Sequence, residues 1–376
     1  MNNTKTTNDE RPVIFAAINR HIEQNIVAPT ETKGRGARVA WGEKDAYPEY
    51  LLSLYRDVAT LGSIINGAVD YVAGNEVTLN SQLFPGGKMN TKGELAVDLV
   101  RGAALDWFLF GGFAFEIIRG RNGAPVEVYN LGLEDIRTNE DVNVFWWSES
   151  WAKGGRDKRM YPAFMPELDW ALLDEDARDR HAASLLYVKN STKQVYPMPL
   201  YAQAVAACET ERSIDAYHLN SIKNGFAAST FVQLCNGVPS SEIQDEVERD
   251  FKDKFTGEDN AGRVILSFSP DRQHSAVIQE LKTDDFGQRY DALAKRCRQQ
   301  IFTSFRANPN LFGIPTDNLG FSAEEYQQAF DLFNRTQIQP VQARIADAFD
   351  RICGATGVLS IEPFNIAGTA PAEVVD

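Results

Sequence analysis

Histidine and cysteine are scarce in this 376-residue chain, and neither is arranged for chemistry. The four histidines are isolated from one another, and neither an H-E-x-x-H nor a G-x-S-x-G motif occurs. The cysteines form no C-x-x-C pair and are expected to be reduced core residues: Cys208, Cys235, Cys297 and Cys353. We therefore expect no catalytic residue, cofactor or metal, and we predict that the protein is not an enzyme.

Long apolar runs and a net positive charge are also missing. No segment approaches the length of a membrane span, and the N-terminal MNNTKTTNDERP lacks the basic-then-apolar pattern of a signal peptide. Synthesis in a cytoplasm and no contact with a membrane are the expectations. The net charge is −14, so the chain as a whole does not neutralise nucleic acid, and any contact with DNA must be local.

What the sequence does contain is a core-forming α+β pattern. An apolar fraction of 43% with 24% charged residues is typical of a globular protein with a substantial core. Residues 1–36 are polar and interrupted, as in a loosely held arm. Residues 37–196 mix helical patterns with short strands, including a hairpin around Asn122-Gly123. One helix is expected to end at Gly74-Asn75.

A different organisation begins at Pro197. The segment 197–225 predicts one uninterrupted helix of about 27 residues, roughly 40 Å long, with an Ala-rich first half that suits close approach by another helix. A compact strand–helix–strand–strand unit occupies 228–282, and a second long helix starts at Asp285 and ends at Phe305. An apolar, Pro- and Gly-bearing loop follows. The last long helix is predicted to break or kink at Pro340.

The order of these segments resembles that of the portal proteins of tailed double-stranded DNA bacteriophages, the head–tail connectors. Four stretches carry the resemblance, and together they cover roughly residues 39–355: WGEKDAYPEYLLSLY, DWFLFGGFAFEIIRGRNGAPVEVYNL, NGVPSSEIQDEVERDFKDKFTGEDNAGRVILSF and FGIPTDNLGFSAEEYQQAFDLFNRTQIQPVQARIADAFDRI. No single stretch is diagnostic. Their order and spacing identify the family.

The resemblance implies an α+β, portal-type fold with named parts. These are an N-terminal arm (1–36), a wing (37–196), stem helix 1 (197–227), an α/β clip (228–282), stem helix 2 (283–306), a channel loop (307–321), a wing helix (322–355) and a C-terminal tail (356–376). Almost nothing follows residue 355, so the crown that many portals carry is expected to be reduced or absent.

The resemblance also implies a function and partners. Portal proteins form rings, usually of twelve copies, at one capsid vertex of the virion. They conduct DNA during packaging and ejection, without sequence specificity, and they dock the terminase motor and a head–tail adaptor. Major capsid protein and a scaffold are further implied partners. Two alternatives stay open: a capsid-associated head–tail adaptor, and an uncharacterised cytoplasmic α+β enzyme.

Three groups of residues are candidates for these roles. The resemblance places the loop residues at the channel wall, whereas a tightly packed connection within one subunit is the alternative. They are Asn308, Asn310, Leu311, Phe312, Ile314, Thr316, Asp317 and Asn318. The clip residues are either a docking surface or a solvated helix face. They are Glu246, Asp250, Asp253, Glu258 and Asp259.

The third group is a basic face on the second stem helix. At 100° per residue, five basic residues fall on one half of the helix: Arg289, Lys295, Arg296, Arg298 and Arg306. They could meet DNA phosphates or the carboxylates of an adjacent subunit, and a solvated face is the plain alternative. The first stem helix offers Glu209, Glu211 and Asp215 as partners.

Overall fold

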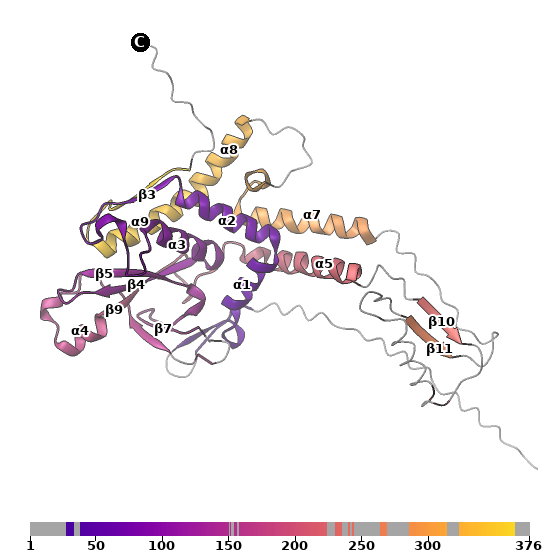
Figure 1. Ribbon diagram of the computed structural model, residues 1–376, viewed down its shortest axis with the longest axis horizontal. Coiled ribbons are helices and arrows are strands. Elements are labelled where there is room, and N and C mark those ends of the chain that lie inside the picture. The colour runs from indigo at the N-terminus through magenta and orange to yellow at the C-terminus, as the bar shows by residue number, and fades with distance from the viewer. Residues whose placement is uncertain are drawn as a thin grey trace, which may run out of the picture.

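A computed structural model describes residues 28–33, 38–149, 151, 154–155, 158–223, 230–234, 240, 243, 264–268, 286–313 and 323–364. Two long helices, α5 (Val205–Lys223) and α7 (Phe286–Phe305), lie side by side and project from a mixed α/β body (Figure 1). Between them in sequence, β10 (Thr230–Leu234) pairs in parallel with β11 (Val264–Phe268). The two long helices and two strands between them are therefore confirmed, whereas their assignment to a stem and a clip stays a prediction.

Three helices form the centre of the body: α1 (Tyr47–Asp57), α2 (Ala59–Ala73) and α3 (Ala96–Phe110). Glycine ends two of them, as the sequence predicts for Gly74. Gly74 has φ 64° and Gly111 has φ 91°, backbone angles that residues with a β-carbon rarely adopt. Gly111 turns the chain directly from α3 into a buried strand, so the helix and the sheet share one core.

Two antiparallel three-stranded sheets pack beside these helices. The first has the order β5–β4–β9 and the second β6–β7–β8. Their strands are β4 (Gly112–Arg119), β5 (Pro125–Leu131), β6 (Ile136–Thr138), β7 (Val144–Trp147), β8 (Arg159–Pro162) and β9 (Ala183–Lys189). The predicted hairpin is confirmed, with Gly123 at φ 82° in its turn. The acidic stretch before β9 is an exposed helix, α4 (Glu175–His181).

The predicted start of the first stem helix is wrong. Residues 197–201 are not helical, a 3-10 turn covers Ala202–Ala204, and α5 begins at Val205. Pro197 and Pro199 explain the difference, because the ring of a proline pushes the preceding residue out of the helical region. The 19 described residues of α5 give a helix of roughly 28 Å rather than 40 Å.

Parts of the expected arm and tail are strands instead. β1 (Glu31–Lys33) pairs with β2 (Val39–Trp41), and β12 (Leu359–Glu362) pairs with β3 (Glu76–Leu79). Leu359 is buried, which anchors the segment after the last helix to the body. Residues 1–27 and 365–376 lie outside the described residues.

The predicted break at Pro340 is confirmed. The last helical segment consists of α8 (Ala323–Phe333), a π turn (Asn334–Ile338) and α9 (Gln339–Cys353). Pro340 has no N–H to donate to the carbonyl of Thr336, and a π turn accommodates that loss within a continuous helical segment.

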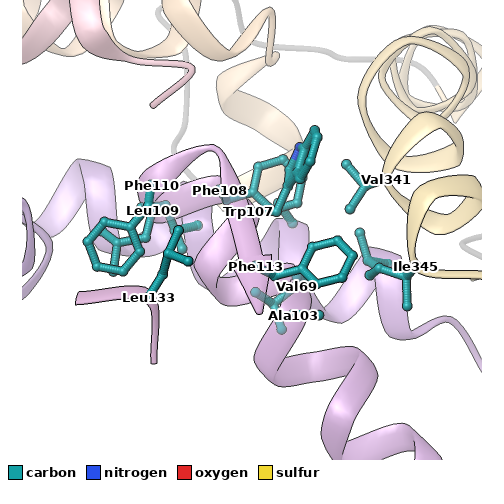
Figure 2. Close-up of a cluster of buried hydrophobic side chains, with 14 of the residues drawn as sticks. Val69, Ala103, Trp107, Phe108, Leu109, Phe110, Phe113, Leu133, Val341 and Ile345 are labelled. Atoms are coloured by element: carbon teal, nitrogen blue, oxygen red, sulfur yellow. The ribbon is translucent and has the colours of Figure 1, made fainter. Parts of the chain in front are cut away.

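The core is centred on the junction of α3 and β4. Phe108, Phe110 and Phe113 are fully buried there. In Figure 2, Leu133 lies on one side of this junction, while Val341 and Ile345 lie on the other. None of the described helices is long and apolar enough to cross a lipid bilayer.

Candidate functional site

The first part of the channel loop packs inside its own subunit. A 3-10 turn, η8 (Pro309–Phe312), is capped by Asn308, whose Oδ1 accepts a hydrogen bond from the Asn310 N–H at 3.0 Å. Leu311 is 5% exposed, and its carbonyl accepts a hydrogen bond from the Tyr71 hydroxyl at 2.8 Å. For these residues the structure therefore favours the packed-connection alternative.

The ring of Phe312 packs η8 against α2, α7 and α8. Its ring lies 6.0 Å from Tyr71, 6.0 Å from Phe302 and 5.6 Å from Phe333, measured between centroids. A β-carbon built on Gly67 would approach this ring to 2.8 Å, so α2 needs a glycine at that position. This anchoring fixes the position of the turn up to Gly313. Ile314, Thr316, Asp317 and Asn318 lie outside the described residues.

The second stem helix has the two faces that its sequence predicts. Cys297, Ile301 and Phe305 are buried, and Phe305 stacks on Tyr201 at 5.5 Å between ring centroids. Leu293 lies on the same side of the helix at 100° per residue, but it is 38% exposed. The exposed residues are Lys295, Arg296, Arg298 and Arg306, whereas the side chain of Arg289 lies outside the described part.

Two of the three carboxylates on the first stem helix already have partners within their own subunit. Both oxygens of Glu209 accept hydrogen bonds from Arg212 at 2.7 Å, and Tyr50 donates to Oε2 at 3.4 Å. Glu211 accepts a 2.6 Å hydrogen bond from Thr60. Both glutamates are buried, so Asp215 is the carboxylate of this helix that is exposed to a neighbour, and pairing of the basic face with an adjacent subunit stays a prediction.

Burial raises the pKa of Glu211 above its ordinary value. Loss of hydration raises its pKa, whereas the Thr60 hydrogen bond and the nearby Arg298 charge lower it. Arg298 thus acts on a carboxylate of its own subunit. The sequence contained a signal for this arrangement, because Glu211 continues the spacing of buried residues along one face of α5: Ala204, Ala207, Cys208 and Ile214.

The body of the protein contains a buried ion pair between Arg137 and Asp45. The sequence did not indicate this pair. Arg137 is 1% exposed, and its Nε donates to Asp45 Oδ1 at 2.6 Å. Arg38 also pairs with Asp45. Burial alone would raise the pKa of Asp45, but the charge of Arg137 and the hydrogen bonds to the carboxylate outweigh it and lower the pKa. The carboxylate therefore stays ionised in the folded chain.

A second buried acidic side chain, Asp106, has no arginine or lysine partner among the described residues. Asp106 on α3 is 5% exposed, and its Oδ2 accepts no hydrogen bond. Burial raises its pKa well above the ordinary range, and the charges of Glu134 and Asp135 on η3 (Leu133–Asp135) raise it further. Nothing in the sequence distinguishes Asp106 from an exposed helical aspartate.

The remaining candidates are thiols and clip residues. Cys208, Cys297 and Cys353 are free thiols, and burial raises the pKa of Cys208 to about 12, as expected of an unreactive core residue. No three described histidine, cysteine or carboxylate side chains are arranged to hold a metal ion. The clip candidates lie outside the described residues: Glu246, Asp250, Asp253, Glu258 and Asp259.

Comparison with known proteins places the fold. No protein-family model and no curated protein matches the sequence. A chain from the neck of a native gene transfer agent (GTA) particle, computed with C12 symmetry, is 17% identical. It aligns at a TM-score of 0.52 over 89% of this chain and 86% of its own. A chain from the neck of the empty GTA particle, computed with C6 symmetry, is 15% identical and has a TM-score of 0.54 over 91% and 88%.

A third structure is an HK97 family phage portal protein from Corynebacterium diphtheriae. It is 11% identical, with a TM-score of 0.48 over 83% of this chain and 93% of its own. At the level of the fold, the predicted α+β architecture is confirmed, and the chain is built like the chains that occupy the neck of GTA particles.

Proposed function

We propose that the protein is a portal-type connector that forms a ring at one vertex of a virion. The observation that carries this proposal is the agreement of fold with a neck chain over 89% of this protein, since it includes the body and the stem. The C12 symmetry given for that neck suggests twelve copies here. Twelve copies of a 41.9-kDa chain have a mass of about 500 kDa.

The helices α5 and α7 support a ring because several of their large apolar side chains remain exposed in a single subunit. Tyr217 and Leu219 on α5 are 46% and 52% exposed, and Leu293 on α7 is 38% exposed. Exposed apolar side chains that lie together usually mark a contact with another protein. In a ring, each pair of stem helices has neighbours on both sides that can cover these residues.

The proposed ring conducts double-stranded DNA without holding it tightly. Twelve chains at −14 each carry a charge of −168, which does not favour a strong grip on phosphates. The channel segment in this proposal is the part of the loop after the anchored turn, including Thr316, Asp317 and Asn318. Lys295, Arg296 and Arg298 are the stem residues from which phosphate contacts are expected.

Docking of a packaging motor and a tail adaptor is assigned to the clip. The acidic residues of its helix are the expected contacts. Charge reversal of Glu246, Asp250 and Asp253 together should leave the rings intact but weaken capture of the motor and the adaptor in pull-down experiments. Unchanged capture of both partners would count against this assignment.

Electron microscopy of the purified protein tests the proposal as a whole. The expected images show rings with a central opening, and side views that narrow toward the clip. A label fused to the clip should decorate the narrow end. Solid particles without an opening would instead favour the adaptor or enzyme alternatives.

A further inference from the structure

Three arginines on one side of the protein form no ion pair with any described carboxylate. Arg296 on the outward face of α7 borders a hollow of about 440 Å³ that Gln203 and Ser304 also line. Arg306 and Arg344 border a second hollow of about 410 Å³, lined by the same Gln203 and Ser304. The two hollows therefore form one open groove. We call Arg296, Arg306 and Arg344 the basic flank.

Four carboxylates gather at α1, η3 and the end of β7. Glu49 and Glu149 are exposed, and Glu134 and Asp135 are half-buried between them. Burial raises the pKa of Asp135 to about 7, with contributions from the charges of Glu134, Glu149 and Glu49. We call these four residues the acidic flank. The raised pKa leaves Asp135 partly protonated near neutral pH, so the exposed Glu49 and Glu149 supply most of the negative charge of this flank.

Two arginines partly compensate the charge of the acidic flank. The charge of Arg137 lowers the pKa of both Glu134 and Asp135, although its Nε also binds Asp45 at 2.6 Å. Arg56 lies 4.0 Å from Glu49, and both side chains are about two-thirds exposed, so this pair is weak. Asp106 adds a further buried carboxyl group next to Glu134 and Asp135, with Oδ2 unpartnered. Asp106 is too deeply buried to reach a second copy, and its raised pKa favours the protonated form, so the exposed Glu49 and Glu149 are the groups that a neighbour can contact.

The two flanks lie on opposite sides of the body. Figure 2 shows Leu133, the first residue of η3, on one side of the α3–β4 junction and Val341 of α9 on the other. On α3 itself, Asp106 interacts with the η3 side, whereas its neighbour Trp107 lies under Arg344, 5.1 Å from the ring centroid to Cζ. Similarly, α2 and α5 pack against both α1 and α7.

We propose that the basic flank of one copy binds the acidic flank of the next copy around the ring. This inference rests on the proposed ring. Two different, complementary surfaces on opposite sides of one chain make a head-to-tail contact, which closes into a ring when the rotation fits. The occupant of the groove is a second copy because the acidic surface that complements it belongs to the same chain. Electrostatic complementarity of this kind fixes orientation and speeds association.

Charge-swap variants test the contact. Arg296→Glu with Arg344→Glu reverses the basic flank, and Glu49→Lys with Glu149→Lys reverses the acidic flank. Each double variant alone should show at least about tenfold less ring in size-exclusion chromatography, since like charges then meet at every contact. An equimolar mixture should restore rings with alternating variants. The fourfold variant should form rings alone, because both flanks are reversed together.

Two controls make the result decisive. Arg121→Glu with Arg180→Glu makes the same charge change at exposed wing positions outside both flanks and should leave rings unchanged. Circular dichroism should show that every variant folds like the wild type. Rings formed normally by either double variant would overturn the inference, and so would loss of rings that neither mixing nor the fourfold variant repairs. A wild-type protein that forms no ring would instead refute the proposed function itself.

Discussion

Replacing Asp106 by Asn should stabilise the folded chain at neutral pH. The carboxyl group of Asp106 is almost completely buried, and its Oδ2 has no hydrogen-bond partner. Asn keeps the size of the side chain and removes the charge. Its Nδ2 can also donate to the buried Asn130 Oδ1, which lacks a partner. Removing an unsatisfied buried acceptor is worth about 1–3 kcal/mol, and more when it is charged.

The sign of the pH dependence follows from the direction of the pKa shift. The pKa of Asp106 is higher in the folded than in the unfolded chain. The stabilising contribution of this group is therefore fully present below the unfolded pKa and is lost as the pH rises toward the folded pKa. The loss is about 1.4 kcal/mol per pH unit within that window. The gain from Asp106→Asn should be large at pH 8 and should shrink toward pH 4.5.

Chemical unfolding at pH 4.5, 6 and 8, followed by tryptophan fluorescence, measures this difference. All samples need the same protein concentration, because assembly changes the apparent stability. Asp141→Asn, at an exposed turn position, is the matched control and should have no effect at any of these pH values. A variant that is less stable than the wild type by the same amount at pH 4.5 and pH 8 would refute the reasoning about Asp106.

Three further substitutions test other features by chemical unfolding. Arg137→Met should lower the free energy of unfolding by about 3–5 kcal/mol, because it leaves Asp45 as a poorly compensated buried charge; no loss would show that Arg38 alone suffices. Gly67→Ala should cost about 1–3 kcal/mol through displacement of Phe312, despite the better helix propensity of alanine. Arg306→Gly should gain up to about 1 kcal/mol, since Arg306 ends α7 at φ 53°, and a loss would indicate that its side chain stabilises the subunit.

Local patterns in the sequence predicted the elements well. The helix that ends at Gly74, the hairpin at Gly123 and the two faces of α7 all depend on nearby residues, so periodicity and turn chemistry suffice. The start of α5 could also have been predicted. Pro197 and Pro199 disfavour helical geometry at the residues before them, which agrees with a helix that begins after both.

Contacts between distant segments could not be predicted in this way. Arg137 meets Asp45 across 92 residues of sequence, and Glu209 meets Tyr50 across 159. A single sequence gives the spacing of polar residues along a helix, but not which of them another segment will bury. The sequence therefore predicted the exposed basic residues of α7, but not the burial of Glu209 and Glu211 within their own subunit.

The mass of the assembly in solution tests the central claim most directly. Light scattering coupled to size-exclusion chromatography should give about 500 kDa, twelve times the 41.9-kDa chain, and the value should be independent of protein concentration over at least a tenfold range. A mass that stays at 41.9 kDa at every concentration would contradict a ring-forming connector.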